Sequence, residues 1–124
     1  IEHYSNSLKV EPEKVALNPL DEELLKKAIA IVEKHMDNVE FSTEIFAREM
    51  CMSRSNLHIK MKALTGESAN DFIRKMRFNQ ACKLLKEGKY TVSEISGMVG
   101  FNTPSYFATS FKKYFGCLPS EYGK

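Results

Sequence analysis

The chain has 124 residues, of which 43% are hydrophobic and 27% charged, and its formal net charge is +2. This is enough apolar material for one core, or for two small cores that share a helix. The first residues contain no apolar run typical of a secretory signal, and no segment is long and apolar enough to span a bilayer. Three cysteines without CxxC spacing favour free thiols in a reducing compartment over a disulfide framework or a zinc site.

The charge is unevenly distributed along the chain. Residues 1–41 carry 5 Lys and Arg against 9 Asp and Glu, whereas residues 42–124 carry 13 against 7. A basic excess favours a polyanionic partner such as nucleic acid, although a solvated basic surface without a partner has the same composition. Charge alone therefore leaves both interpretations open.

The beginning of the chain is expected to be an arm followed by a helix. Residues 1–20 contain two prolines and no sustained apolar period, which is typical of a linker or arm from an upstream domain. A helix is predicted to begin at Asp21, with acidic residues in its first turn that suit the helix dipole. His35 is expected only to lie near the C-terminus of this helix, not to bind a metal. The predicted buried stripe of the helix is Leu25, Ala28, Ile29, Val32 and Met36.

A first helix-turn-helix is predicted over residues 42–66. Ser42 can cap a short helix, the turn falls at Cys51, and Gly66 ends a second helix. The second helix contains three basic residues and no acid between Arg54 and Lys62. Its buried positions are predicted to be Leu57, Met61 and Leu64.

A longer helix is predicted over about residues 69–86, with Gly88 as its stop. At about 1.5 Å per residue this helix would span roughly 27 Å, near the roughly 34 Å between successive major grooves on one face of DNA. Its core candidates are Phe72, Ile73, Met76, Ala81, Leu84 and Leu85.

A second helix-turn-helix is predicted over residues 91–116. Thr91 and Glu94 have the spacing of a capping box, and Gly100 can adopt the positive φ of a tight turn. Pro104 suits the first turn of the following helix. Because no strand-like alternation appears, the chain is predicted to be all-α, with two helix-turn-helix subdomains joined by a long central helix.

The two helix-turn-helix stretches align on their apolar positions and turns. Allowing a one-residue insertion in the second turn, six pairs of residues coincide: Phe46 and Ile95, Met50 and Val99, Cys51 and Gly100, Leu57 and Phe107, Met61 and Phe111, and Gly66 and Gly116. Two copies of a groove-reading unit suggest a protein that reads two grooves of DNA.

The candidate DNA-binding residues lie on the second helix of each copy. In the first copy they are Arg54, Ser55, Asn56, His58, Ile59, Lys60 and Lys62. In the second copy they are Thr103, Pro104, Ser105, Ala108, Thr109, Lys112 and Lys113. Basic side chains suit phosphates, whereas His58 can hydrogen-bond a base edge and Ile59 offers only van der Waals contact, for instance to a thymine methyl. A solvated helix face is the alternative interpretation of these residues.

Other functions have weaker support in the sequence. The aromatic residues between 106 and 115 could stack on single-stranded nucleic acid, but their helical spacing favours the core for most of them. Cys51 and His58 lack a second pair at metal-ligand spacing, and no nucleophile elbow or phosphate-binding glycine loop is present. No enzyme, catalytic residue, metal or cofactor is therefore predicted. A helical module that docks an acidic protein is the alternative to DNA binding.

Several motifs carry a family resemblance. Residues 53–66, FIRKMRFNQACKLL at 72–85 and ISGMVGFNTPSYFATSFKKYFGCLPSEY at 95–122 resemble the DNA-binding domain of the AraC/XylS transcription regulators over about residues 21–122. The resemblance implies about seven helices, recognition helices in adjacent major grooves and a structural role for Arg77. Relatives often have basic residues at the positions of Ile59 and Thr109, and Gly at that of Cys51.

The segment before the first helix-turn-helix carries a narrower resemblance. LNPLDEELLKKAIAIVEKHMDN is similar to the segment that joins a receiver domain to an AraC-type effector in Bacteroides-type hybrid two-component systems. This implies control of glycan-utilisation genes by a cytoplasmic output domain whose parent is anchored in the inner membrane. The expected partners are double-stranded DNA, an upstream receiver domain and RNA polymerase. The full-length protein is expected to be a homodimer and the isolated domain a monomer.

Overall fold

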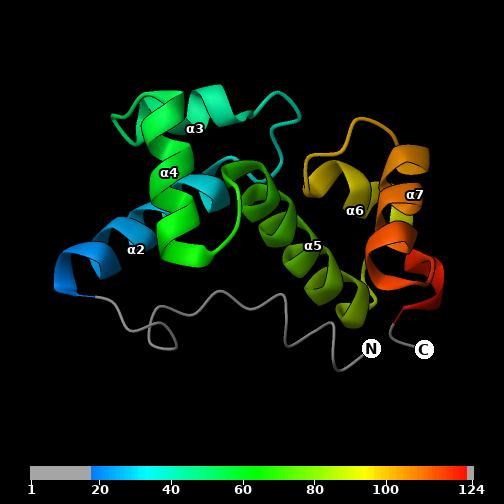
Figure 1. The fold of residues 1–124 in the computed structure, drawn as a ribbon. Helices are drawn as coiled ribbons and strands as arrows, with labels where there is room; N and C mark the ends of the chain where they lie inside the picture. The colour runs from blue at the N-terminus through cyan, green and yellow to red at the C-terminus, as the bar shows by residue number, and fades with distance from the viewer. Residues whose placement is uncertain (1–17, 123–124) are drawn as a thin grey trace. The chain divides into compact units, whose positions relative to one another are not determined.

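The computed structural model describes residues 18–122, so the greater part of the expected arm, residues 1–17, lies outside the described residues. The elements in chain order are α2 (Pro19–Lys34), α3 (Thr43–Glu49), α4 (Arg54–Thr65), α5 (Ala69–Glu87), α6 (Val92–Met98), α7 (Pro104–Phe115) and the 3-10 helix η2 (Pro119–Glu121) (Figure 1). Residues 18–122 contain no strand. The all-α class is confirmed, with two helix-turn-helix pairs, α3–α4 and α6–α7, flanking the long helix α5 in the sequence.

The chain divides into two compact units. The described part of the N-terminal unit comprises residues 18–35 and 41–76, and that of the C-terminal unit comprises residues 36–40 and 77–122. Helix α5 contributes residues 69–76 to the first and residues 77–87 to the second. Its 19 residues span about 28 Å at about 1.5 Å per residue. Gly88 has a φ of +68°, consistent with its predicted role as the stop of this helix.

Helix α2 begins earlier than the sequence predicted. Asn18 is its N-cap, since the Asn18 side chain accepts a hydrogen bond from the backbone N–H of Asp21, and Pro19 is the first helical residue. An N-cap asparagine followed by proline is a favourable helix start, so the prediction that residues 19–20 belong to an arm is wrong. Asp21 and Glu22 still lie in the first turn, where their charges favour the helix dipole.

The buried face of α2 also differs from the predicted one. Leu25, Ala28 and Val32 are buried as predicted, but Ile31 is buried in place of Ile29. The face in contact with the core is therefore centred on Ala28. Ile31, three positions later, lies on this face, and Ile29 lies at its edge. Met36 belongs to the C-terminal unit, where it packs partly buried against the core.

The core of the N-terminal unit is built on aromatic rings from three segments. Phe46 of α3 and Phe72 of α5 are fully buried with ring centroids 6.1 Å apart, and Phe41 lies 5.9 Å from Phe46. Full burial of one such side chain contributes about 1.5–3 kcal/mol. The recognition-helix side of this core consists of Leu57, Met61 and Leu64, as predicted.

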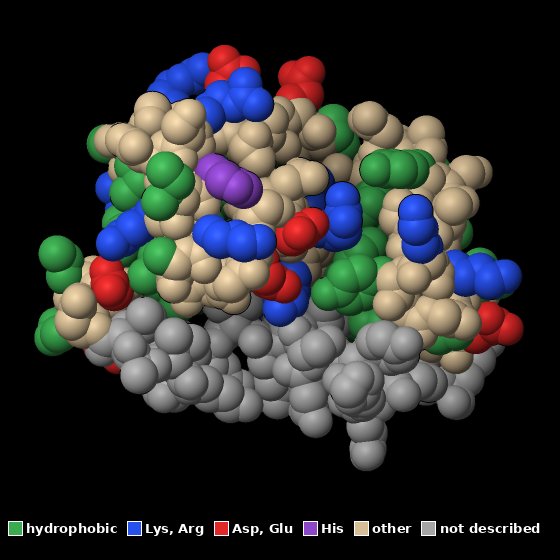
Figure 2. Space-filling model, viewed as in Figure 1, with side chains coloured by type: hydrophobic (Ala, Val, Ile, Leu, Met, Phe, Trp, Pro, Cys, Tyr) green, Lys and Arg blue, Asp and Glu red, His purple; other side chains and the backbone are tan. Residues whose placement is uncertain are grey.

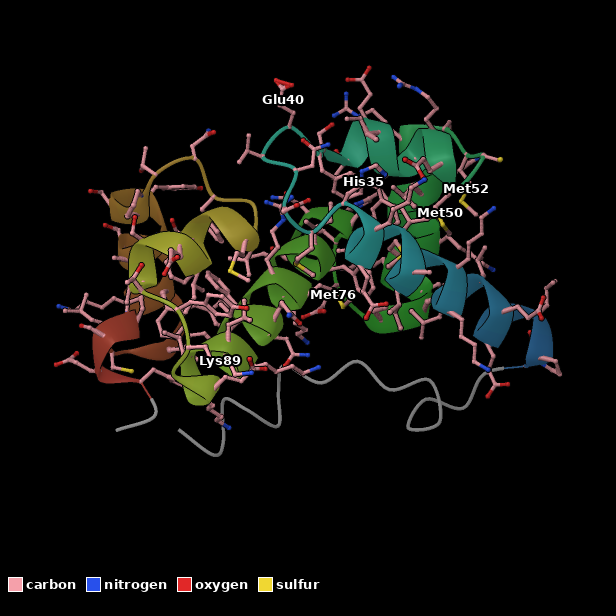
Figure 3. All side chains as sticks on the ribbon, turned by 180° about the vertical axis from the view of Figure 1, so that it is seen from behind. His35, Glu40, Met50, Met52, Met76 and Lys89 are labelled. Atoms are coloured by element: carbon pink, nitrogen blue, oxygen red, sulfur yellow. The ribbon has the colours of Figure 1, made fainter. Side chains whose placement is uncertain are left out.

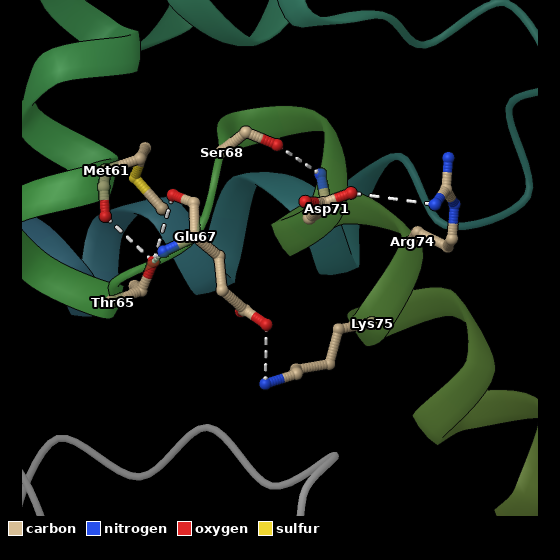
Figure 4. Close-up of polar contacts among 7 residues, drawn as sticks. All are labelled: Met61, Thr65, Glu67, Ser68, Asp71, Arg74 and Lys75. Carbon is tan, nitrogen blue, oxygen red and sulfur yellow. Dashed lines mark hydrogen bonds and ion pairs between the residues drawn. The ribbon is translucent and has the colours of Figure 1, made fainter. Parts of the chain in front are cut away.

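Polar contacts fix the turn between α4 and α5 (Figure 4). The Thr65 hydroxyl donates to the carbonyl oxygen of Met61 at 2.8 Å, and Lys75 pairs with Glu67 at 2.9 Å. The Ser68 side chain accepts from the backbone N–H of Asp71, as an N-cap does. The last turn of α4 is thereby tied to the first turns of α5 within the N-terminal unit.

The core of the C-terminal unit is centred on Phe78 of α5. Four aromatic rings surround its ring with centroid distances of 4.9 to 6.0 Å, namely Phe101, Phe111, Tyr114 and Phe115. Buried Ile95 and Val99 from α6 and Phe107 from α7 complete this core. Both helices of the second helix-turn-helix are therefore held by apolar contacts to α5.

Arg77 joins the segment 36–40 to the second turn. Its guanidinium donates to the carbonyl oxygens of Gly100 at 2.5 Å and of Asn38 at 2.9 Å, and only 8% of the residue is exposed. Burial lowers the pKa of Arg77, but an arginine stays protonated in proteins. The structural role that the family resemblance implied for Arg77 thus consists of two hydrogen bonds to main-chain oxygens.

Candidate nucleic-acid interface

The two helix-turn-helix pairs have the same local construction. Helices α3 and α6 each have 7 residues, and α4 and α7 each have 12. Each of the four begins with a hydroxyl N-cap whose oxygen accepts from a backbone N–H three residues later, the caps being Ser42, Ser53, Thr91 and Thr103. The predicted capping box of Thr91 and Glu94 is confirmed. The second helix of each pair therefore begins at a defined residue, set by its N-cap.

The two turns share one backbone conformation. Cys51 and Gly100, which the sequence alignment pairs, both have positive φ, at +61° and +81°. The next N–H in each turn donates to an equivalent carbonyl at 2.9 Å, Met52 to Ala47 and Phe101 to Ser96. The pairing of the two turns is thus confirmed at the level of the backbone.

Helix α4 presents the predicted face to solvent. Its exposed residues include Arg54, Ser55, Asn56, His58, Ile59 and Lys62, all candidates from the sequence. Lys60 is the exception, because it is half-buried and its ammonium group lies 3.2 Å from a carboxylate oxygen of Asp21. This contact, which holds a candidate phosphate-binding lysine against the first turn of α2, is not apparent from the sequence.

A hollow of about 780 Å³ lies beside the N-terminal half of α4. We call it the α4 hollow, and its lining comes from α3, α4 and the start of α5: Thr43, Arg54, Ser55, His58, Ile59, Ser68, Ala69 and Asn70. None of these residues is acidic. The hollow therefore offers a cationic and hydrogen-bonding surface with no lining carboxylate to repel an anion.

Helix α7 presents a similar face to solvent. Pro104, Ser105, Thr109, Lys112 and Lys113 are exposed, whereas Ala108 is half-buried. The side-chain oxygen of Thr103 already accepts the N-cap hydrogen bond from Tyr106. The buried side of the helix consists of Phe107, Phe111 and Phe115.

Tyr106 is the exposed member of the aromatic residues between 106 and 115. It is 59% exposed in the first turn of α7, and its ring lies 5.6 Å from that of Phe101. Phe107, Phe111 and Phe115 are buried and Tyr114 packs partly buried against the core, so the prediction that most of these residues belong to the core is confirmed. Tyr106 lies off the buried stripe that Phe107 begins.

The recognition helices differ in charge from the other helices. Neither α4 nor α7 contains an Asp or Glu, whereas α2, α3, α5 and α6 each contain at least one. Figure 2 shows Lys, Arg and His side chains beside exposed hydrophobic ones over α4, and Lys or Arg side chains over α7. Carboxylates are thus kept off the two helices proposed to face a polyanion.

His35 connects α2 and α3 inside the N-terminal unit (Figure 3). Its ring nitrogen Nε2 contacts a carboxylate oxygen of Glu49, and its ring stacks on Phe41 with centroids 4.7 Å apart. The hydrogen bond from His35 lowers the pKa of Glu49, with smaller contributions from the charges of His35 and Lys34. His35 lies at the C-cap of α2, as expected, and it also braces the first helix-turn-helix.

Other chemistries receive no support from the described residues. All three cysteines are free, and burial raises the pKa of the Cys82 thiol. Within residues 18–122 no three His, Cys, Asp or Glu side chains are grouped so that they could hold a metal ion. No helix in the described part of the chain is long and apolar enough to cross a membrane.

Comparisons with known proteins agree with this geometry. A family described as a helix-turn-helix domain matches residues 46–124. The histidine kinase P4 of Formosa agariphila is 40% identical over 119 residues, which are 96% of this chain and 9% of that protein. The chain spans between 9% and 36% of the length of the curated relatives it matches.

Two solved structures are similar in both fold and sequence. The C-terminal domain of AraT, a response regulator from Geobacillus stearothermophilus, has a TM-score of 0.76 and 28% identity, and the match covers 88% of this chain and 87% of that one. The DNA-binding domain of AdpA, a global transcriptional factor in complex with a target DNA, has a TM-score of 0.72 and 28% identity. That match covers 81% of this chain and 88% of the other.

Proposed function

Because this chain belongs to the AraC-type helix-turn-helix DNA-binding domains of transcription regulators, we propose that it binds double-stranded DNA through α4 and α7. The observation that carries this assignment to the two helices is their shared construction: a capped start, a buried apolar side and an exposed side free of carboxylates. Each helix would lie in a major groove, with α5 setting the separation between two adjacent grooves.

The exposed residues of α4 divide into two proposed roles. Arg54, Asn56 and Lys62 would contact phosphates, whereas Ser55 and His58 would meet base edges. Lys60 is less suited to a phosphate than the sequence suggested, because Asp21 already neutralises its charge. Arg54 and His58 both line the α4 hollow, whose lining contains no acidic residue, so both can approach a polyanion.

The exposed residues of α7 suit weaker base reading. Ser105 and Thr109 can hydrogen-bond many base edges, and Pro104 and Ala108 offer only small apolar contacts. Lys112 and Lys113 would supply the phosphate contacts of this helix, and the main chain at Thr103 could add one at the helix start. We therefore propose that DNA shape supplies much of the specificity at the second groove.

The full-length context is also a proposal. Similarity to a histidine kinase and to a response regulator supports an output domain of a two-component system, preceded by a receiver domain. We propose a homodimeric full-length protein with its output domain in the cytoplasm, its parent anchored in the inner membrane, and RNA polymerase as a further partner. Control of glycan-utilisation genes rests on the resemblance of residues 17–38 alone.

The DNA-binding domain is proposed to extend from Asn18 to Tyr122, with residues before it serving as a linker. Within it the chain would act by binding and not by catalysis. The alternative of a module that docks an acidic protein is not favoured, because the family is one of DNA-binding regulators.

Titration of the chain against duplex DNA at several salt concentrations tests the proposal. If Arg54, Lys62, Lys112 and Lys113 each contact one phosphate, affinity should fall roughly a hundredfold between 50 and 200 mM salt, because bound counterions are released. Lys62→Ala and Lys112→Ala should each lower the salt slope by about one. Lys27→Ala and Lys89→Ala, exposed lysines outside both recognition helices, are the matched controls. Affinity independent of salt would rule the proposal out.

A further inference from the structure

Ile59 is an apolar side chain that the fold leaves in solvent. It is 66% exposed in the middle of α4, whereas Leu57 and Met61 on either side of it are at most 1% exposed. Because Ile59 is two positions from Leu57 and two from Met61, it lies on the opposite side of the helix from the core. Packing within the described N-terminal unit therefore gives no reason for an isoleucine at this position.

The surroundings of Ile59 suit the edge of a base pair. It lines the α4 hollow together with Arg54, Ser55 and His58, and the exposed Lys62 follows three residues later on the same helix. No carboxylate lines the hollow. A major groove that approaches the hollow therefore meets no carboxylate in its lining, and the group it meets at Ile59 is apolar.

Major-groove edges carry one apolar group, the C5-methyl of thymine, and all their other distinguishing groups are hydrogen-bond donors or acceptors. An isoleucine can complement the methyl, but it would leave a donor or acceptor of guanine, cytosine or adenine without a partner. We propose that Ile59 recognises a thymine through its methyl group, so that the N-terminal unit reads its site by apolar contact. This inference rests on the proposed function, in which α4 lies in the major groove.

The neighbours of Ile59 sharpen the expectation. The commonest specific major-groove contact is Arg or Lys with guanine, and an isoleucine at position 59 cannot make it. His58 precedes Ile59 and can hydrogen-bond the adjacent base pair. The preferred site of α4 should thus contain a thymine that cannot be exchanged for cytosine, beside a base pair whose identity depends on His58.

Replacement of thymidine by deoxyuridine tests the methyl contact directly. Duplexes that bind this chain are first selected from a random pool, and each thymidine of the best duplex is then replaced singly by deoxyuridine, which removes only the methyl. Burial of one such carbon is worth about 0.8 kcal/mol, so one position should lose about fourfold in affinity. Thymidines outside the contact should lose little.

A chemical double-mutant cycle assigns that position to Ile59. The variant Ile59→Ala should bind the thymidine duplex several-fold more weakly and should show no further loss with deoxyuridine, because the partner of the methyl is gone. Leu20→Ala is the matched control, since Leu20 is 77% exposed in the same unit but lies on α2. This control should retain the fourfold dependence on the methyl. Ile59→Val, which keeps a branched side chain, should fall between.

The outcomes separate this inference from the proposed function. If no duplex is selected at all, the proposed function fails and the inference fails with it. If duplexes bind with steep salt dependence but no deoxyuridine substitution lowers the affinity, the methyl contact is wrong while DNA binding stands. The same holds if the losses of affinity from Ile59→Ala and from deoxyuridine simply add. If Ile59→Ala leaves DNA affinity unchanged, Ile59 makes no contact with the duplex and the methyl contact is likewise wrong.

Discussion

The two helix-turn-helix pairs have the same turn conformation but different residues at its positive-φ position. Both turns need one residue with positive φ, and the first uses Cys51 where the second uses Gly100. A residue with a Cβ costs roughly 1–2 kcal/mol in this conformation, yet the first turn tolerates it. The difference lies in what surrounds the Cβ position and not in the backbone.

The surroundings of the two positions are opposite. Cys51 is exposed, so its side chain extends into solvent. A Cβ added to Gly100 would overlap the Arg77 guanidinium and lie 2.6 Å from the carbonyl oxygen of Met36. Glycine is therefore required in the second turn by tertiary packing, whereas in the first turn it would only relieve a modest backbone strain.

The largest effect is expected for Gly100→Ala. The backbone strain and the overlap with Arg77 together should lower the free energy of unfolding by about 4 kcal/mol, a value reached when packing itself must rearrange. Urea unfolding followed by circular dichroism measures this. The matched control is Gly116→Ala, because Gly116 also has positive φ, at +85°, but has open space at its Cβ position. That control should cost only about 1 kcal/mol, and equal losses would refute the role of Arg77.

Replacing Arg77 with methionine tests the other side of the same contact. Two main-chain carbonyl oxygens, of Gly100 and Asn38, would lose their donors, at a cost of about 3 kcal/mol. Native-state hydrogen exchange should show faster exchange in the C-terminal unit than in the N-terminal unit. Arg74→Met is the control, since Arg74 is exposed on the same helix. Uniform destabilisation of both units would contradict the assignment.

The recognition helices should differ in how a truncation affects binding. His58→Ala removes one proposed base contact of α4, so affinity for a selected duplex should fall about fivefold, or about 1 kcal/mol, with little change on random DNA. Thr109→Ala, its counterpart on α7, should change both affinities less than twofold. Competition titrations with selected and random duplexes measure both ratios. Identical behaviour of the two variants would remove the proposed asymmetry.

The conversion of Cys51 to glycine should be mildly stabilising. Relief of the positive-φ strain outweighs the greater freedom that glycine gives the unfolded chain, by about 0.5 kcal/mol. Thermal unfolding under reducing conditions detects such a change. Cys117→Gly, at a half-buried site without positive φ, should destabilise the protein instead. Destabilisation by Cys51→Gly would mean that the thiol makes a contact worth more than the strain.

The smallest effect concerns a contact that only the first pair has. Glu49 ends α3 and bonds His35, whereas its counterpart in the alignment, Met98, packs partly buried against the second core. Because the folded pKa of Glu49 lies below its ordinary value of 4.5, this bond stabilises the fold above that pH and is lost as the pH falls through the lowered pKa. Unfolding curves of Glu49→Gln and wild type should therefore differ at pH 7 and approach each other as the pH is lowered below 4.5. Glu44→Gln, on the exposed side of α3, should show no such convergence.

Local signals in the sequence predicted most of the fold. Caps such as Thr91 and turn residues such as Gly100 and Gly116 act within a few residues, so their spacing sufficed to set the helix ends. The observed start of α2 lies before the predicted one although Asn18 and Pro19 are a local signal of a helix start, because two prolines within residues 1–20 also favour a linker. The exchange of Ile31 for Ile29 was not visible locally, since it depends on how the helix is rotated against its neighbours.

The candidate site divides in the same way. Exposure of His58 and Ile59 followed from helical spacing once Leu57 and Met61 were assigned to the core. The ion pair of Lys60 with Asp21 could not be predicted, because it joins residues 39 positions apart through the packing of α2 on the first pair. Contacts of this kind decide which cations remain available to a ligand, and they appear only when the helices are assembled.

The oxygens that hold Arg77 belong to the main chain, and a main-chain carbonyl has no proton to gain or lose in any solution where proteins fold. Acid that protonates Glu49 and so breaks its bond with His35 therefore leaves the hydrogen bonds of Arg77 at the second turn intact.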